Sequence, residues 1–248
     1  MSEPIDKSQW TAEAQFFDRE AASQALTPLD PKIVERYARH TRHWAIDFQF
    51  ALTGDLRGKR VLDVGAGMGE NSLLLAALGA QVTAIDISPA SLEVLRQRAE
   101  LSGLSGRIET VCKPLEEWRP PESFDIVWVD AFLHHVLSNL PFVLEQLKSF
   151  AGARGRFILA EPFAPRRLRQ LRMALPIPAN GTPGERPLNR SELRLIRACF
   201  PGIRTRHFLF LSRLHRFTPR AEMFTAFDGA LLRLPVVKLL GGSVVMWT

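Results

Sequence analysis

Apolar and polar residues follow two different periods along this chain, and the switches between them divide it into short strands and helices. Short apolar runs bounded by turn residues predict strands at 60–64, 81–85, 107–112, 124–129 and 155–160. Apolar residues three and four positions apart predict helices at 70–78, 89–102 and 139–151. Strands that alternate with helices form parallel sheets with right-handed crossovers, so the pattern predicts an α/β fold.

The two ends of the chain break this alternation. Helical periodicity over 10–26 and 31–53 predicts an N-terminal helical cap in residues 1–55, with one larger domain in 56–248. Beyond residue 161 the pattern stops, and residues 162–190, rich in proline and arginine, are predicted to form a lid or substrate loop. The remainder predicts a helix at 189–200, a strand near 203–213, a helix near 219–239 and a seventh strand at 242–247.

A glycine-rich turn follows the first predicted strand, in the stretch RVLDVGAGMGE of residues 60–70. Glycines between a strand and a helix let backbone N–H groups approach a ligand. The dinucleotide fingerprint would require glycine at position 70, where this chain has Glu70. A carboxylate there repels a pyrophosphate but suits a ligand that carries an ammonium and a sulfonium.

Two aspartates extend that argument. Asp63 adds negative charge just before the glycines, and Asp86 ends the second predicted strand, 21 residues after Gly65. An acidic side chain at the Asp86 position accepts both hydroxyls of a ribose. Together these residues favour S-adenosylmethionine as the ligand.

Four segments in this order also resemble the class I SAM-dependent methyltransferase family. They are VLDVGAGMGE (61–70), VTAIDIS (82–88), FDIVWVDAFLHHV (124–136) and GRFILAEP (155–162). The resemblance covers residues 55–165 and implies a Rossmann-like, seven-stranded, doubly wound, mostly parallel sheet whose last strand is antiparallel. It implies a SAM-dependent methyltransferase, with S-adenosyl-L-homocysteine as product.

The same resemblance implies the cofactor contacts. Asp63 and Glu70 are expected near the methionyl amino group, although Asp63 could instead brace the loop and Glu70 could cap the following helix. Asp130 is expected to face the transferable methyl or the methionyl amine. The family often has an acidic residue after the third strand, where this chain has Pro114, so the backbone of Leu115 is expected to serve the adenine instead. The other expected contacts are Gly65, Ala66, Gly67, Asp86, Ile87 and Tyr37.

Catalysis is assigned to three side chains after the fourth and fifth strands. Adjacent residues of a helical turn diverge by about 100°, so one of His134 and His135 is expected to enter the cavity as a general base. The alternative is a histidine that only bonds the backbone. Glu161 is expected to orient the acceptor or bind a proton, or else to pair with a nearby arginine.

The acceptor is predicted to be a small, partly hydrophobic metabolite of natural-product, quinone or lipid type, methylated at oxygen or carbon. The cap supplies aromatic side chains for it, and Arg166, Arg167, Arg169 and Arg172 offer a grip for an anionic group. A DNA base is not expected, because the family's motif for it is missing after the fourth strand, where the chain reads DAFL. An RNA methyltransferase and a non-catalytic SAM-binding protein stay as alternatives.

Charge, cysteine spacing and apolar content narrow the choice among these alternative functions. The net charge is +6, and residues 154–220 contain fifteen arginines and three acids, a local balance of 15 − 3 = +12 that would suit RNA or another anion. No nucleic-acid module is visible, so nucleic acid is not the favoured partner. Cys112 and Cys199 fit no metal spacing, and we expect neither disulfide nor metal. The chain lacks long apolar runs, so a cytoplasmic protein is expected, with membrane contact of 219–239 as an alternative and the oligomeric state open.

Overall fold

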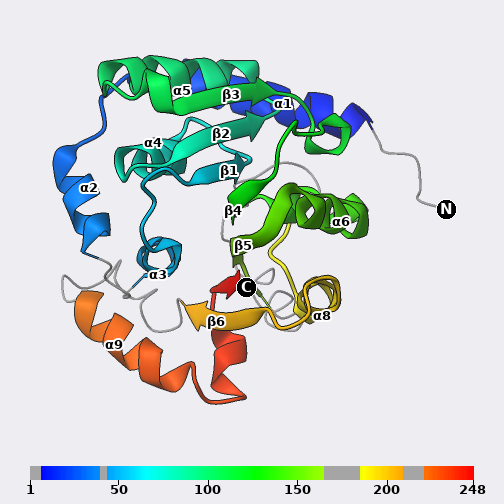
Figure 1. Ribbon diagram of the computed structural model, residues 1–248. Coiled ribbons are helices and arrows are strands. Elements are labelled where there is room, and N and C mark those ends of the chain that lie inside the picture. Colours follow the sequence, from blue (N-terminus) through cyan, green and yellow to red (C-terminus); the bar gives the residue numbers. More distant parts are fainter. Residues whose placement is uncertain (1–6, 40–43, 165–184, 209–220) are drawn as a thin grey trace.

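A single mixed sheet organises the chain. The computed structural model describes residues 7–39, 44–164, 185–208 and 221–248 (Figure 1). The strands are β1 (Arg60–Val64), β2 (Gln81–Asp86), β3 (Ile108–Cys112), β4 (Phe124–Asp130), β5 (Ala151–Pro162), β6 (Arg204–Phe208) and β7 (Ser243–Trp247). Their order is β3-β2-β1-β4-β5-β7-β6, and β7 pairs antiparallel with both β5 and β6. This confirms the predicted seven-stranded, mostly parallel sheet with an antiparallel last strand.

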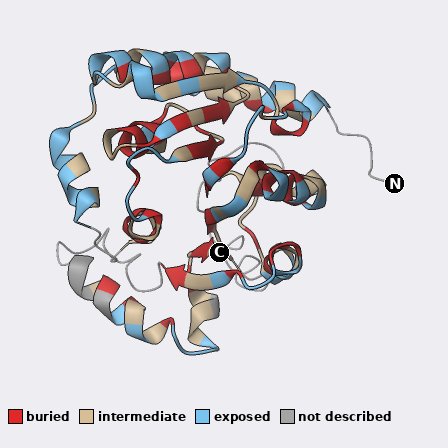
Figure 2. Ribbon diagram, in the orientation of Figure 1, coloured by how far each residue is buried: buried red, intermediate tan, exposed pale blue. Residues whose placement is uncertain are grey.

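The central strands are buried on both faces, which is why they read as continuous apolar runs (Figure 2). Leu62, Val127 and Val129 point to one face, and Val61 and Trp128 point to the other. All five are fully buried. The alternation of side chains in the strands therefore supplies two apolar layers, one for each set of helices.

Helices cover both faces of the sheet. They are α1 (Lys7–Ala22), α2 (Pro31–Ala38), α3 (Ala45–Thr53), α4 (Glu70–Ala77), α5 (Pro89–Leu101), α6 (Leu140–Phe150), α8 (Arg190–Cys199) and α9 (Ala221–Leu231). Helices α3, α4 and α5 cover the face that contains Val61 and Trp128, and α6 and α8 cover the face that contains Leu62, Val127 and Val129. The ends follow local chemistry: the Ser88 hydroxyl accepts from the Ser91 N–H at the start of α5, as its N-cap position predicts.

The predicted N-terminal cap divides into two parts. Helix α1 lies along α5 (Figure 1), and its Asp18 carboxylate accepts from the Ser88 hydroxyl at 2.6 Å and from the Ala90 N–H at 3.1 Å. Helix α3 instead packs on β5 and β7 through Phe48, which contacts Phe208. Only α1 therefore lies over the end of the sheet where the predicted site is.

Two predicted helices differ from the observed ones. The single helix expected over 31–53 is α2 and α3, which are separate elements in the described residues. The helix expected near 219–239 ends at Leu231, and a short 3-10 turn, η6 (Val237–Leu240), follows it. Pro235 lies between them, and its missing N–H and its ring disfavour a continuous helix. Among the described helices none is long and apolar enough to cross a bilayer.

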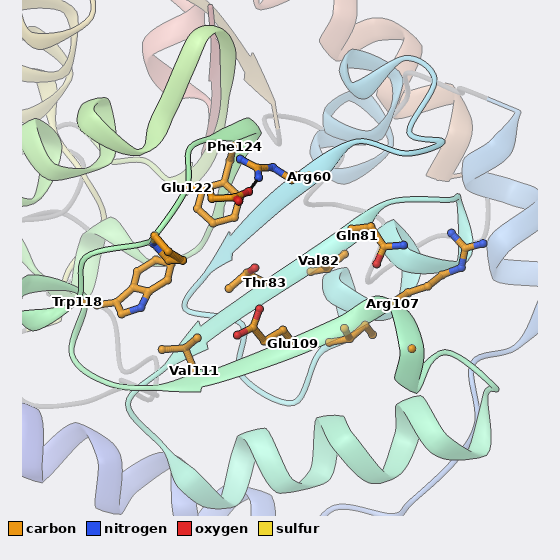
Figure 3. Close-up of a pocket in the computed structure, with 13 residues that line it drawn as sticks. Arg60, Gln81, Val82, Thr83, Arg107, Glu109, Val111, Trp118, Glu122 and Phe124 are labelled. Atoms are coloured by element: carbon orange, nitrogen blue, oxygen red, sulfur yellow. Dashed lines mark ion pairs between the residues drawn. The ribbon is translucent and has the colours of Figure 1, made fainter.

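One corner of the sheet has no helix over it. The connection from β3 to β4 forms only the 3-10 turn η2 (Leu115–Glu117), so the face formed by β2 and β3 stays open. The resulting hollow has a volume of about 400 Å³. Figure 3 shows Thr83, Glu109 and Val111 on its floor and Trp118 at its side. Helix α5 contacts β2 and β3, whereas no described helix covers their face at Thr83 and Val111.

Candidate functional site

A cavity of about 480 Å³ opens where β1, β2 and β4 end, under the first helix. Ligands of open α/β sheets bind at this edge, outside the carboxyl ends of the strands. Helix α1 contributes Trp10, Glu13 and Phe17 to its wall. The other lining residues are Val64, Gly65, Ala66, Gly67, Glu70, Asn71, Ile85, Asp86, Ile87, Lys113, Leu115, Glu116, Asp130, Ala131, Phe132, His134, His135 and Val136.

The glycine loop forms one side of this cavity. Gly65 and Gly67 have φ angles of +69° and +52°, a region that other residues rarely adopt. A Cβ at Gly65 would come within 2.6 Å of a ring carbon of Phe132, whereas a Cβ at Gly67 would meet no heavy atom within 4 Å. A side chain at Gly65 would therefore clash with Phe132, whereas a side chain at Gly67 would extend into open space.

Asp86 lies where the sequence places it, at the end of β2 and on the cavity wall. Its two carboxylate oxygens accept from the Gly67 N–H and the Ser88 N–H, each at 2.8 Å. Burial raises the pKa of Asp86, and these backbone donors partly offset that rise. The carboxylate is therefore fixed in direction, and the remaining lone pairs of its oxygens are available to a ligand.

Glu70 also lines the cavity, but its charge is not free. Its carboxylate pairs with Arg98 at 2.7 Å, and the same guanidinium nitrogen donates to the carbonyl of Met68 at 2.8 Å. The argument that Glu70 would repel a pyrophosphate is weakened, because Arg98 offsets the negative charge.

Asp63 and Tyr37 are not brought to the cavity. Asp63 is 2% exposed and accepts from the Ser72 hydroxyl at 2.6 Å, so it braces the start of α4 from below the loop. Burial raises the pKa of Asp63 to about 7. Tyr37 packs its ring on Phe50, with ring centres 4.7 Å apart, because α2 rests on α3 rather than over the glycine loop. For these two residues the expected contact with the cofactor amino group or the cofactor itself is not supported.

Asp130 ends β4 and lines the cavity together with Ile87 and Leu115, as expected. Asn71, which the sequence reasoning missed, donates to the Asp130 carboxylate at 3.0 Å. Burial raises the pKa of Asp130 to about 6. The next residue, Ala131, has a φ of +55°, and this left-handed turn redirects the chain from β4 into the cavity wall.

Glu161 organises the turn after β4. One of its oxygens accepts from the N–H groups of Phe132 and Leu133, at 2.9 and 2.6 Å, and the other accepts from His134 Nδ1 at 2.8 Å. Glu161 is 3% exposed and does not line the cavity, so it acts on a ligand only through this turn. These contacts do not support a direct contact of Glu161 with an acceptor, and its printed partners in the described chain are this turn and His134 rather than an arginine.

Both histidines line the cavity, although the sequence predicts that only one would. They belong to the 3-10 turn η3 (Leu133–His135), and their ring centres are 4.2 Å apart. The divergence of adjacent Cα–Cβ bonds does not fix where long side chains end, since rotation about χ1 and χ2 brings the rings together. Burial lowers the pKa of His135 to about 4, whereas the contacts of His134 with Glu161 and Glu185 overcome burial and raise its pKa.

Sequence reasoning missed two acids near these histidines. Glu185 approaches His134 Nε2 at 3.2 Å, and Glu13 of α1 lies 4.0 Å from His135 Nδ1. Glu185 lies within the predicted loop of residues 162–190, near whose ends Phe163 and Leu188 form a bridge. Residues 165–184, with all four arginines assigned to an anionic group, lie outside the described residues.

Several arginines of the basic segment bind the chain itself. Arg156 donates to the carbonyls of Leu52 and Thr53, at 2.9 and 2.6 Å. Arg186 pairs with Glu192 at 2.9 Å. These arginines hold elements together, which reduces the charge offered to RNA by the described part of the segment. Cys112 and Cys199 are free thiols in the structure.

Part of the chain is similar to known methyltransferases. Residues 61–155 match the methyltransferase domain family. The chain is 35% identical over 142 residues to the ubiquinone biosynthesis O-methyltransferase of Methylocella silvestris, which covers 56% of this chain and 53% of that protein. It is 34% identical over 117 residues to the demethylmenaquinone methyltransferase of Tropheryma whipplei, covering 47% of each. The chain thus spans about half the length of these curated relatives.

Solved structures share the fold over more of the chain. The DhpI–SAM–HEP complex matches with a TM-score of 0.58 and 16% identity, over 98% of this chain and 99% of that one. Magnesium protoporphyrin IX methyltransferase from Synechocystis PCC 6803 with bound SAM matches with a TM-score of 0.55 and 20% identity, over 83% and 90%. The cyclase SpnF matches with a TM-score of 0.59 and 17% identity, over 100% and 98%. At such identities the likeness shows the fold, and the fold alone does not fix the reaction.

Proposed function

Because the chain has the motifs and the fold of the class I SAM-dependent methyltransferases, we propose that it transfers the methyl group of S-adenosylmethionine to an oxygen of a small metabolite. The observation that carries this proposal is the cavity itself. One end is formed by the glycine loop and the fixed carboxylate of Asp86, and the other by His134 and His135. A cofactor at the first end would direct its methyl toward the second.

The binding of cofactor is assigned to Gly65, Ala66, Gly67, Asp86 and Ile87, with Leu115 at the adenine and Asp130 near the methionyl group. Asp86 is assigned the ribose hydroxyls, because its oxygens are held at the end of β2 by two backbone donors. Glu70 is assigned to the start of helix α4, where it forms an ion pair with Arg98. It also lines the cavity, and the amino group of the cofactor is assigned to this part of the cavity wall.

We assign an oxygen acceptor of quinone type. The relatives named above are a ubiquinone biosynthesis O-methyltransferase and a demethylmenaquinone methyltransferase, which makes a partly hydrophobic ring a fitting acceptor. Trp10 and Phe17 offer flat apolar surfaces beside the histidines for such a ring. A phenolic hydroxyl must lose its proton to attack a methyl group, and His134, oriented by Glu161, is the candidate base.

The first test is calorimetric titration of the purified chain with S-adenosylmethionine, S-adenosylhomocysteine and NAD. Micromolar binding of the first two, with no binding of NAD, is the expected result. Labelled cofactor then permits a screen of catechols, hydroxyquinols and hydroxy acids, and methyl transfer to a ring hydroxyl is expected. NAD binding without SAM binding would contradict the proposal.

A further inference from the structure

Three metal-binding side chains meet at the histidine end of the cavity. His134, His135 and Glu185 each offer one ligand atom, and these atoms all lie within 4.8 Å of one another. His134 Nε2 and Glu185 Oε1 are 3.2 Å apart. Two ligands that bind one zinc ion at about 2.0–2.1 Å in tetrahedral geometry lie about 3.3–3.5 Å from each other, so this pair already has the spacing of a shared ion.

The contacts of His134 determine which of its two ring nitrogens can bind a cation. Glu161 is acceptor-only when ionised, so the short contact at His134 Nδ1 places the ring proton there. The lone pair of Nε2 then faces the carboxylate of Glu185 at 3.2 Å, a contact that a proton or a metal ion on Nε2 stabilises. A metal ion differs from a proton in that it also engages His135.

The wider surroundings favour positive charge as well. Glu13 is 7% exposed and lies near His135 Nδ1, an atom that is buried and has no hydrogen-bond partner among the described residues. Several carboxylates therefore surround two imidazoles, with Lys113 as the one Lys or Arg among the described lining residues.

We propose that His134, His135 and Glu185 bind a divalent cation of the zinc type at the acceptor end of the cavity. Two imidazoles and one carboxylate are the donors of many catalytic zinc sites, and they suit zinc, cobalt or iron better than magnesium or calcium. Three protein ligands leave a coordination position for an oxygen. Glu161 orients His134 in the manner of the carboxylates that support metal-binding histidines. The proposal departs from the expectation that no metal binds.

What the cation does rests on the proposed function, whereas its binding does not. A phenolic oxygen in the open position has a lowered pKa, so its proton leaves to solvent without a histidine base. The oxygen then forms a bond to the methyl carbon, and the bond from sulfur to that carbon breaks with its electron pair remaining on sulfur. In this arrangement His134 is a ligand rather than a base.

The test uses the full chain, stripped with a chelator and dialysed against zinc or cobalt. We expect one equivalent of zinc per chain and a cobalt absorption spectrum without a thiolate charge-transfer band. His134→Ala and Glu185→Gln should each weaken zinc binding at least 10-fold, and Glu161→Gln should weaken it by about 10–100-fold. Glu93→Gln on the exposed side of α5 and Cys112→Ser are the matched controls, expected to leave affinity unchanged.

Two results would overturn the site: no zinc retained by the parent chain, or unchanged affinity in both His134→Ala and Glu185→Gln. Circular dichroism melts identify any variant that fails to fold, and Glu185→Gln keeps shape at a partly exposed position. Titration with S-adenosylmethionine separates the two proposals. Zinc binding without cofactor binding would contradict the proposed function alone, and cofactor binding without zinc would contradict the metal site alone.

Discussion

The two ends of the cavity are built in different ways. The cofactor end consists of one continuous turn and the next strand end, where backbone N–H groups of Gly67 and Ser88 hold Asp86. The histidine end gathers side chains from α1, the turn after β4, the end of β5 and residue 185. A site formed by one short stretch of chain is recognised from the sequence as a motif, whereas a site assembled from distant segments is recognised only in the folded structure.

The largest effect is expected at the cofactor end. Asp86→Ala should weaken binding of S-adenosylmethionine at least 100-fold, because it removes a charged acceptor for two ribose hydroxyls. Calorimetry measures the affinity, and Glu93→Ala on the exposed face of the neighbouring helix is the control. An affinity within threefold of the parent would place the ribose elsewhere.

At the histidine end, Glu161→Gln should lower turnover by about 10–100-fold while cofactor affinity changes less than threefold. Glutamine keeps the shape but lowers the charge that orients His134 and stabilises its protonated or metal-bound form. The pH profile of turnover distinguishes this from general damage, because burial would then dominate and lower the pKa of His134. An unchanged profile with reduced turnover would indicate a purely structural role.

The sheet was predictable because its strands are local and doubly buried. Runs such as Val127 to Val129 have few other uses, and the alternation with helices fixes the parallel order. Tertiary contacts decided the rest. The helix after residue 219 ends before Pro235, and α3 packs on β5 and β7 through Phe48 instead of forming a cap with α1.

The part of the site that strand ends form was predictable from the sequence. Asp86, Gly67 and Asp130 lie on the cavity wall because strand ends converge at one edge of the sheet. Asp63 precedes the loop but points below it, since alternate residues of a strand face opposite ways. Glu185 had no signal at all in the sequence, because its approach to His134 depends on a return of the chain through Leu188.

A smaller effect separates two glycines of the same loop. Gly65→Ala should destabilise the fold by about 1–3 kcal/mol or more, from its φ of +69° and its contact with Phe132. Gly67→Ala has only the backbone strain, of about 1–2 kcal/mol, because its Cβ meets open space. Urea denaturation of both variants gives the free energies of unfolding. Equal losses of unfolding free energy in the two variants would mean that Phe132 moves aside at little cost. Packing would then not explain Gly65, and contact with a ligand would be the reason for both glycines.

The smallest effect concerns Asp63, whose burial raises its pKa to about 7. An unfolded aspartate titrates near about 3.9, so between about pH 4 and 7 the unfolded chain releases a proton that the folded chain keeps. Asp63 therefore favours the folded state below pH 4, and this contribution is lost as pH rises through 7.

Asp63→Asn keeps an acceptor for Ser72 and removes the titration, so its melting temperature relative to the parent should rise from pH 5 to pH 8. All other titratable groups affect the melting temperatures of parent and variant equally, so their effects cancel in the difference. Glu109→Gln, at an exposed position of β3, is the control variant that removes a carboxylate without removing Asp63. Parallel melting curves across this range would mean that Asp63 is ionised in the fold, and its carboxylate would then add to the negative charge beside the cofactor end.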